Sequence, residues 1–328
     1  MKKLLLLTCL LFSAGLSSQN IKGLSKDAFA HTYSIVARDT ITGEMAVGVQ
    51  SHWFSVGSIV SWGKAGVGVV ATQSFVNPAY GPEGLELMAN GISAEQALTR
   101  LVEKDEGRAY RQVAFLDANG NVSGFTGEKC VEAAEDLQGK NFSVQANMML
   151  NDEVIPAMAE AFVRYSDYPL PERVVEALKA AQEAGGDIRG KQSAALIVVG
   201  PERTDKSWEE KKIDLRVDDH KTPIRELERL LKVHRAYEHM NKGDLAVEEG
   251  NMQKALKEYG AAEKMFPENL EMKYWKAVAL ANSGRLEEAK PIFKKVFSED
   301  ENWREMTTRL PASGILTVSD EELQAIIE

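Results

Sequence analysis

Cysteine is nearly absent from this sequence of 328 residues, which contains only two. Cys9 lies within an apolar run close to the amino terminus, so removal of that segment would leave Cys130 alone. A single cysteine cannot form an intrachain disulfide, and the fold must therefore be stabilised by its hydrophobic core. We expect Cys130 to be a small buried side chain, because the nearby sequence offers no evident base to activate a nucleophilic thiol.

Long hydrophobic runs beyond residue 20 and clusters of basic residues are also lacking. No later window approaches the ~20 apolar residues that a membrane-spanning helix needs. The formal net charge is −10, and without a stripe of lysine and arginine this charge disfavours nucleic acid as a partner. Walker, Rossmann and His-Glu-x-x-His motifs are absent, so we expect neither a cofactor nor a metal. Hydrophobic residues make up 44% of the chain, which makes a globular core feasible.

The amino terminus has the pattern of a secretory signal peptide. Residues 2–3 are lysines, residues 4–12 form a short apolar stretch, and small residues follow. Such a stretch is too short to span a membrane and is typical of a cleaved signal. Cleavage after Ser17 fits best, and cleavage two residues earlier or one residue later is also consistent with the pattern. We therefore expect an exported protein, periplasmic or extracellular, in which residues 18–31 form a linker.

Residues 32–222 have the pattern of one α+β domain. Strands and helices occur in blocks rather than in strict alternation, which favours antiparallel sheets with covering helices over a doubly wound parallel sheet. Ser93, followed three residues later by Gln96, predicts the start of one helix. The predicted strands are 32–38, 45–50, 57–62, 67–73, 111–117, 122–126, 142–147, 194–199 and 212–217, and the predicted helices are about 82–90, a second from Ser93, 152–165 and one from Pro171 to Gly185.

Residues 223–328 are helical and charged, and they contain a repeat of 34 residues. This period, with small and aromatic residues at matched positions, resembles tetratricopeptide repeats. An ordinary helical bundle is the alternative. We expect flanking helices at 224–240 and after Ser319 to cap the two units, and we expect the repeats to bind a protein partner. The matched pairs are Gly250 with Gly284, Ala255 with Ala289, and Tyr259 with Phe293.

Several blocks together resemble a bacterial and archaeal family of unknown function that is placed among the Ntn-hydrolase-like folds. The resemblance covers about residues 32–235 and implies a four-layer αββα sandwich of two antiparallel sheets. Some relatives carry an appended peptidoglycan-binding-like module, whereas this chain carries helical repeats. The blocks are Thr32-Tyr-Ser-Ile-Val-Ala-Arg-Asp39, Ala65-Gly-Val-Gly-Val-Val-Ala-Thr-Gln73, Asn77-Pro-Ala-Tyr-Gly-Pro-Glu-Gly-Leu-Glu86, Phe125-Thr-Gly-Glu-Lys-Cys130, Gln145-Ala-Asn147, Gly185-Gly-Asp-Ile-Arg-Gly-Lys-Gln-Ser-Ala-Ala195 and Asp214-Leu-Arg-Val-Asp-Asp-His220.

The resemblance makes Thr32 the candidate nucleophile. Ntn hydrolases attack an amide carbonyl with the side chain of an amino-terminal Thr, Ser or Cys, whose own α-amine serves as the base. Here His31 precedes Thr32, so a cut between the two residues is required in addition to signal cleavage. The alternative is a threonine that merely opens a strand. Ser34, two residues further along the same strand face, is a weaker candidate.

Other polar residues are candidates for supporting roles. Lys64 and Arg38 carry charges that can lower the pKa of an amine or bind a substrate carboxylate. Asn147 follows an apolar strand and is a candidate oxyanion donor, with a turn-capping role as the alternative. The remaining candidates for substrate binding are Gln73 at a strand end and four residues of a glycine-bearing loop, Asp187, Arg189, Gln192 and Ser193.

The sequence therefore supports two functions. The first is an exported Ntn-type amidohydrolase acting on a small amide or peptide-like substrate, with repeats that dock a partner. The second is a non-catalytic binding or scaffold protein that retains the fold. Asp218-Asp219-His220 is better explained as a charged turn than as a metal site, because three adjacent residues do not converge easily on one ion. Large sandwiches of this kind often self-associate, so a homo-oligomer is also expected.

Overall fold

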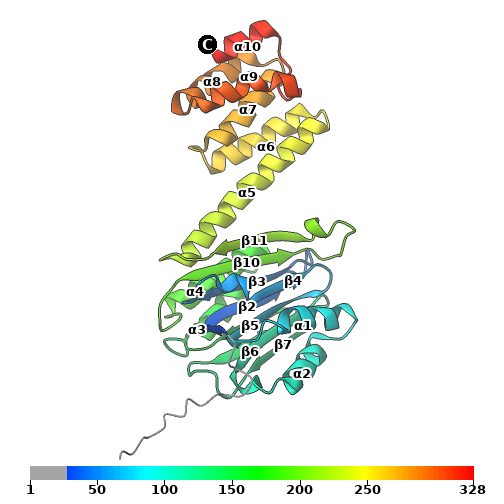
Figure 1. Ribbon diagram of the computed structural model, residues 1–328, viewed down its shortest axis with the longest axis vertical. Coiled ribbons are helices and arrows are strands. Elements are labelled where there is room, and N and C mark those ends of the chain that lie inside the picture. Colours follow the sequence, from blue (N-terminus) through cyan, green and yellow to red (C-terminus); the bar gives the residue numbers. More distant parts are fainter. Residues whose placement is uncertain (1–27) are drawn as a thin grey trace, which may run out of the picture.

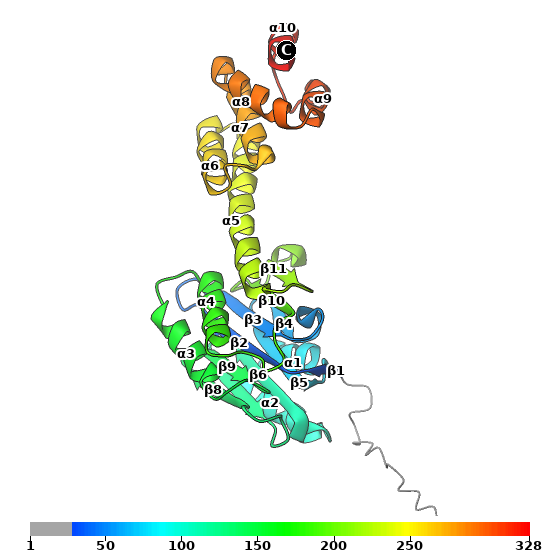
Figure 2. The ribbon, with the colours of Figure 1, turned by 90° about the vertical axis from the view of Figure 1, so that its left-hand side faces the viewer.

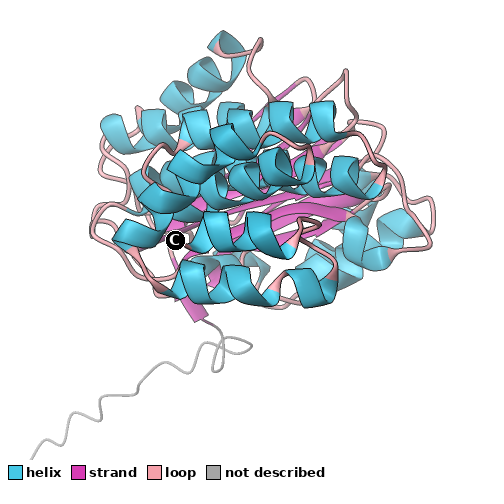
Figure 3. Ribbon diagram, turned by 90° about the horizontal axis from the view of Figure 1, so that it is seen from above, coloured by secondary structure: helices cyan, strands magenta, loops and turns pink. Residues whose placement is uncertain are grey.

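The computed structural model describes residues 28–328 and is elongated (Figure 1). A sandwich of sheets and helices forms one end, and a stack of helices forms the other (Figure 2). Seen down the long axis, the helices of the stack lie in front of the strands of the sandwich (Figure 3). The expected signal peptide at 1–17, and most of the expected linker at 18–31, fall outside the described residues.

Two antiparallel sheets form the centre of the sandwich. In the first sheet the order is β1 (Ala28–Ala30), β5 (Gly68–Val76), β6 (Arg111–Asp117) and β7 (Val122–Thr126), and β4 (Ser61–Lys64) also pairs with β5. In the second sheet the order is β11 (Lys211–Val217), β10 (Ser193–Val199), β3 (Met45–Ser51), β2 (Thr32–Arg38), β9 (Phe142–Ala146) and β8 (Glu135–Gly139). Strand β2, which opens with Thr32, therefore lies inside its sheet.

Helices cover the outer face of each sheet, which gives four layers. The first sheet packs against α1 (Tyr80–Ala89) and α2 (Ala94–Lys104), and the second packs against α3 (Val154–Arg164) and α4 (Leu170–Glu183). Small and branched side chains such as Val47, Ala71 and Ile197 fill the space between the sheets. The α+β class predicted from the sequence is confirmed, and the order of the elements matches an αββα sandwich.

Three local predictions were wrong. The strand expected at 57–62 begins only at Ser61, as β4, because residues 56–58 form a short 3₁₀ helix and a turn follows it. A Cβ atom on Gly57 would lie 2.4 Å from the Cβ of Ala195, so the backbone here runs too close to β10 for an ordinary side chain. Strand β8 was missed because it is a polar edge strand without apolar alternation. Strand β1 was missed because its three residues lie in the expected linker.

Helix α5 (Pro223–Glu248) joins the sandwich to the repeats. Its first turns place Ile224 and Leu227 in the core of the sandwich, whereas Met240, further along, belongs to the core of the repeats. Arg235 in the middle of α5 forms a two-pronged ion pair with Glu172 of α4, at 2.8 and 2.9 Å. One continuous helix thus contributes to the cores of both parts.

The helices that follow are α6 (Met252–Met265), α7 (Leu270–Asn282), α8 (Leu286–Glu299), α9 (Asn302–Arg309) and α10 (Asp320–Ile327). Gly250 and Gly284 occupy equivalent turns with φ of 71° and 73°, a conformation that favours glycine. The paired alanines and the paired aromatic residues of the repeat are all buried. The helix expected after Ser319 is α10, and Ser319 forms a capping box with Glu322 at its start. No helix in the part of the chain that the structure describes is long and apolar enough to cross a membrane.

Candidate active site around Thr32

Thr32 lies where the chain passes from one sheet to the other. Strand β1 pairs with β5 of the first sheet and ends at Ala30, and β2 of the second sheet begins at Thr32. The Thr32 hydroxyl donates a hydrogen bond of 2.8 Å to the carbonyl oxygen of Ala30, and the residue is fully buried. In the uncleaved chain, therefore, residues 28–31 cover the candidate nucleophile.

Two side chains donate hydrogen bonds to the carbonyl oxygen of His31, which belongs to the peptide bond before Thr32. The Ser51 hydroxyl lies 2.5 Å from this oxygen, and the Arg189 Nη2 lies 2.8 Å from it. Two hydrogen-bond donors on one carbonyl oxygen, one of them a cation, polarise the bond and favour negative charge on that oxygen. This arrangement is what a carbonyl needs if it is to be attacked by a hydroxyl.

Asp187 positions the Arg189 guanidinium. Its side chain is completely buried and accepts bonds from Arg189 Nε at 3.0 Å and from Arg189 Nη2 at 2.8 Å. It also accepts bonds from the backbone amides of Arg189 and His52, at 2.9 and 3.1 Å. The carboxylate is therefore well satisfied, and the guanidinium has little freedom to leave the His31 carbonyl.

A network of buried amide side chains extends from Thr32 between the two sheets. Gln73 Nε2 donates to the Thr32 carbonyl at 3.1 Å and to Gln112 Oε1 at 2.7 Å. Asn147 Nδ2 donates to the same Gln112 oxygen at 2.9 Å. The Ser34 hydroxyl donates to Gln73 Oε1 and accepts from Gln145 Nε2, both at 2.6 Å. Because every strand that carries these residues is central or well paired, the network fixes the backbone around Thr32.

The His31 side chain is buried in an aromatic environment beside this network. Its Nδ1 lies 2.5 Å from Asn147 Oδ1, and its ring centroid lies 3.9 Å from that of Phe29. Burial lowers the pKa of His31 below its ordinary value, the hydrogen bond to Asn147 opposes this shift, and the Arg189 charge adds to it. Its Nε2 has no hydrogen-bond partner among residues 28–328. The neutral imidazole is therefore the favoured form.

Among the residues proposed from the sequence, the structure brings together Thr32, Asn147, Gln73, Asp187 and Arg189. Each contacts either Thr32 itself or the peptide bond before it, except that Asp187 acts through Arg189. Thr32, Asn147 and the loop that carries Asp187 and Arg189 lie at the same end of the strands of the second sheet, and Gln73 faces them from the first sheet. The sequence could suggest these residues one by one but could not show that they meet.

Lys64 and Arg38 lie away from this group, contrary to the role proposed for them. Lys64 pairs with Gly68, at the end of β5 remote from Ser74. Arg38 is the last residue of β2, six positions after Thr32. Because a strand advances about 3.3 Å per residue, Arg38 lies roughly 20 Å along β2 from Thr32, and Gly68, the partner of Lys64, lies roughly 17 Å along β5 from Gln73. Neither charge can act directly on Thr32.

Ser193 and Gln192 are close in sequence to Arg189, but the structure gives them other contacts. The Ser193 hydroxyl donates to the Trp53 carbonyl and accepts from the Val56 amide at 3.1 Å, which holds the turn after β3. Gln192 contributes its backbone amide to the Ser51 carbonyl at 3.1 Å. Both residues therefore support the loop that carries Ser51, and neither side chain reaches Thr32 by a hydrogen bond.

Four residues of the site were not identified from the sequence: His31, Ser51, Gln112 and Gln145. A usable signal was present, because Gln112 and Gln145 are polar residues within strands that are otherwise largely apolar. Such residues are costly to bury without partners, so several of them in one domain predict a shared polar network. His31 was assigned to the linker, and Ser51 was not proposed for the site.

Cys130 and the Asp218–His220 turn each make contacts with other parts of the sandwich or with the neighbouring chain. Burial raises the pKa of the Cys130 thiol, whose sulfur lies 3.3 Å from the Arg111 carbonyl oxygen. Asp218 Oδ1 accepts a 2.6 Å bond from the Ser55 hydroxyl, and His220 Nδ1 accepts a 3.1 Å bond from the Thr222 amide. Across residues 28–328, no group of three or more His, Cys, Asp or Glu side chains is arranged to hold a metal ion.

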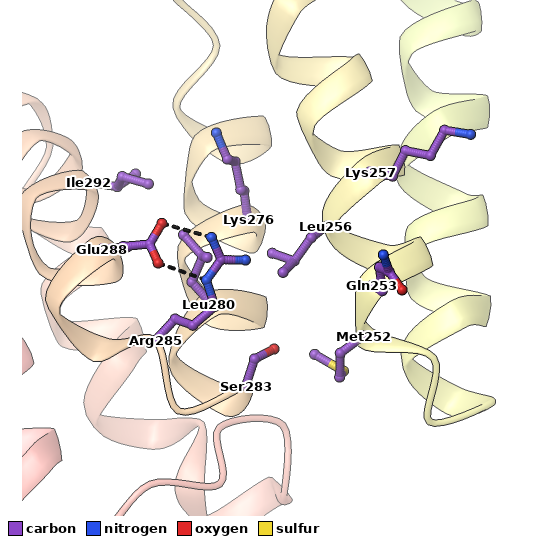
Figure 4. Close-up of a pocket in the computed structure, with 10 residues that line it drawn as sticks. All are labelled: Met252, Gln253, Leu256, Lys257, Lys276, Leu280, Ser283, Arg285, Glu288 and Ile292. Carbon is purple, nitrogen blue, oxygen red and sulfur yellow. Dashed lines mark hydrogen bonds and ion pairs between the residues drawn. The ribbon is translucent and has the colours of Figure 1, made fainter.

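The repeats carry two cavities that differ in charge. The cavity between α6, α7 and α8 has a volume of about 630 Å³, and its lining includes Lys257 and Lys276 (Figure 4). Arg285 and Glu288 form a two-pronged ion pair at its edge, with both bonds at 2.7 Å. The cavity between α5 and α7 has a volume of about 440 Å³, and its charged lining residues are all acidic: Asp244, Glu248 and Glu271.

Comparisons with known proteins match two parts of the chain. Residues 32–227 match the model of a Family of unknown function (DUF1028), and residues 240–296 match a tetratricopeptide repeat model. A crystal structure from Silicibacter pomeroyi, of a protein assigned to DUF1028, is 33% identical to this chain, with a TM-score of 0.56. The match covers 62% of this chain and 88% of that protein. A comparison with curated proteins found no match. The chain therefore belongs to the DUF1028 family and carries tetratricopeptide repeats after the family domain.

Proposed function

We propose that this protein is an exported amidohydrolase that uses Thr32 as its nucleophile after the chain is cut between His31 and Thr32. The observation that carries this proposal is the pair of donors, Ser51 and Arg189, on the carbonyl oxygen of the peptide bond directly before Thr32. The match to the family model begins at residue 32, so the family domain starts where the cut would place the new amino terminus.

The same geometry supports an intramolecular cut. The Thr32 hydroxyl attacks the His31 carbonyl carbon, the carbon–nitrogen bond breaks, and the hydroxyl proton passes to the Thr32 nitrogen. Water then hydrolyses the resulting ester, which leaves a carboxylate on His31 and a free amine on Thr32. Ser51 and Arg189 stabilise the negative charge that develops on the carbonyl oxygen during the attack.

Turnover of a substrate repeats this chemistry with an external amide. The free Thr32 amine accepts the hydroxyl proton as oxygen attacks the substrate carbonyl, and the proton is passed to the departing amine. Water then cleaves the ester, releases the acid and restores Thr32. The ordinary pKa of an α-amine is about 7.7–8.0, and the adjacent Arg189 cation favours its neutral, basic form.

The test compares two chains that differ at one side chain. A chain that begins Met-Thr32 and ends at residue 328 is expressed so that the initiator methionine is removed, and its partner carries Thr32→Ala. Intact mass verifies both amino termini. We expect the threonine chain to hydrolyse members of a panel of peptide anilides and N-acyl amino acids, and the alanine chain to be at least 10³-fold slower. Equal rates, or no turnover of any amide, would contradict the proposal.

Processing and export are tested on the full-length chain. We expect purified full-length protein to yield a fragment that begins at Thr32, and the variants Thr32→Ala and Arg189→Gln to yield much less of it. Fractionation of the native host should place the mature protein outside the cytoplasm. A full-length chain that stays intact while the Met-Thr32 chain is active would separate the hydrolase activity from self-processing.

A second function, binding of a protein segment by the repeats, is favoured by the acidic cavity between α5 and α7. Its acidic side chains, with Tyr237 and Trp275 beside them, suit a basic segment with an apolar or aromatic residue. We expect a Lys-Leu repeat peptide to bind the full chain more tightly than a Glu-Leu peptide of the same length. The variant Glu271→Gln should weaken this preference, and the exposed Glu287→Gln on α8 should not. Equal binding of both peptides would contradict it.

A further inference from the structure

Strand β1 is attached to the sandwich as a peptide would be. Its three residues pair in antiparallel register with Val76, Phe75 and Ser74 of β5. The earlier part of the same edge of β5 is covered by β4, which pairs with residues 68–71. Removal of the chain before Thr32 would therefore leave the edge of β5 at residues 74–76 without its partner strand. A free strand edge of this kind can accept an extended peptide through main-chain hydrogen bonds.

The side chains of residues 29–31 occupy positions formed by other parts of the fold. The Phe29 ring makes an edge-to-face contact with Phe75, with centroids 4.4 Å apart. Ala30 is fully buried in the core between the sheets, where only a small side chain is accommodated. The His31 ring is fully buried against Phe29 and bonds to Asn147. These positions accept an aromatic residue, a small residue and an imidazole in succession, so a peptide bound in the place of residues 29–31 is selected by its sequence.

The last carbonyl of this stretch meets a charged group. The Arg189 guanidinium, held by Asp187, donates to the neutral carbonyl oxygen of His31. A carboxylate at the same position would form a charge-assisted and stronger bond than a peptide carbonyl does. Cleavage after His31 produces such a carboxylate. The residues around Arg189 are therefore better matched to the cleaved product than to the intact peptide.

We infer that residues 28–31 occupy the acyl-side substrate site of this protein, and that its substrate is an extended peptide that pairs with β5 in their place. Counting back from the cut bond, the preferred segment has an imidazole or similar ring in the first position, a small residue in the second and an aromatic residue in the third. This inference rests on the proposed function, and it names the substrate class. The released leader would act as a competing ligand until it dissociates.

The first experiment measures binding and needs no catalysis. The Met-initiated chain that carries Thr32→Ala, with its initiator methionine removed so that position 32 comes first, is titrated by calorimetry with the peptide Ac-Ala-Phe-Ala-His carrying a free carboxylate. Three peptides serve as controls: the same peptide with an amidated end, Ac-Ala-Ala-Ala-His, and the reordered Ac-Ala-His-Ala-Phe. We expect each control to bind at least 10-fold more weakly. In the variant Arg189→Gln, the acid and amide forms should bind equally.

The outcomes separate the two proposals. Absence of binding by Ac-Ala-Phe-Ala-His at millimolar concentration, or equal binding by all four peptides, overturns the inference. The p-nitroanilide of the same peptide is then offered to the chain that begins at Thr32. Binding of the acid without hydrolysis of the anilide leaves the peptide site in place and refutes the hydrolase. Hydrolysis of unrelated amides without binding of this peptide refutes the peptide site and leaves the hydrolase in place.

Discussion

Replacing Gln112 by leucine removes the amide at the centre of the network below Thr32. Gln112 is fully buried, and its Oε1 accepts bonds from Gln73 and Asn147. Its Nε2 donates to the Ala146 carbonyl at 2.8 Å. After the change, Gln73 Nε2 keeps the Thr32 carbonyl at 3.1 Å, but Asn147 Nδ2 retains only the same carbonyl at 3.5 Å. Gln73 Nε2 also keeps the Gln145 carbonyl at 3.3 Å, so the groups that lose most are the Asn147 amide and the Ala146 carbonyl, each of which loses its bond to Gln112.

The expected loss of stability follows from these contacts. A buried polar group left without a partner costs about 1–3 kcal/mol. The leucine side chain recovers part of this through its apolar surface, on the order of 1 kcal/mol. For two such groups, we therefore expect the variant Gln112→Leu to lower the free energy of unfolding by about 1–5 kcal/mol. Urea unfolding of the full chain, followed by tryptophan fluorescence and far-ultraviolet circular dichroism, measures the change.

The matched control is Gln138→Leu on the edge strand β8. Gln138 is exposed, and its amide bonds only to Asp136 at 3.2 Å. We expect this change to alter the free energy of unfolding by less than about 0.5 kcal/mol. If Gln112→Leu costs less than about 1 kcal/mol, or no more than Gln138→Leu, the bonds of Gln112 do not stabilise the fold around Thr32.

Three further predictions concern single side chains. The pKa of His31 is lowered in the fold, so the unfolded chain binds a proton at this residue more readily than the folded chain does. The free energy of unfolding, measured by urea titration, should therefore fall as pH drops below about 6.5. The variant His31→Gln should show a smaller fall, and the same pH dependence in both proteins would contradict the prediction. The raised pKa of Cys130 leaves less of its thiol in the reactive thiolate form at neutral pH. Iodoacetamide should therefore alkylate Cys130 at least 10-fold more slowly than it alkylates glutathione, and equal rates would refute this prediction. The variant Arg235→Ala should lower the free energy of unfolding by about 1 kcal/mol, because it leaves Glu172 of α4 without this partner. The control Arg229→Ala, at an exposed ion pair, should have no measurable effect. Equal losses in the two variants would contradict a stabilising role for the ion pair between α4 and α5.

Much of the fold could be predicted from local patterns. Strands such as β2 and β3 are apolar runs bounded by turn residues, and helix starts such as Ser93 carry their own capping residues. The repeat was visible because Gly250 and Gly284 must adopt the same left-handed turn. The elements that were missed, β1 and β8, have no such pattern. They are strands because a neighbouring edge pairs with them.

The candidate site was only partly predictable. Thr32 and Asn147 could be proposed individually, because each lies at a strand end. Lys64 was proposed on its charge alone, and distance along the sheet removes it from the site. Residue type shows which chemistry a side chain can perform, but only the pairing of strands shows which side chains are neighbours.

The sequence by itself determined the α+β class, the helical repeats and the presence of a threonine that opens a strand, because these depend on periodicity and on local backbone preferences. The tertiary structure decided that Ser51, Arg189 and the buried amides converge on the His31–Thr32 peptide bond. It also decided that residues 28–31 lie over Thr32. These contacts join residues far apart in the chain, and their geometry is set by sheet register and layer packing, which no local pattern encodes.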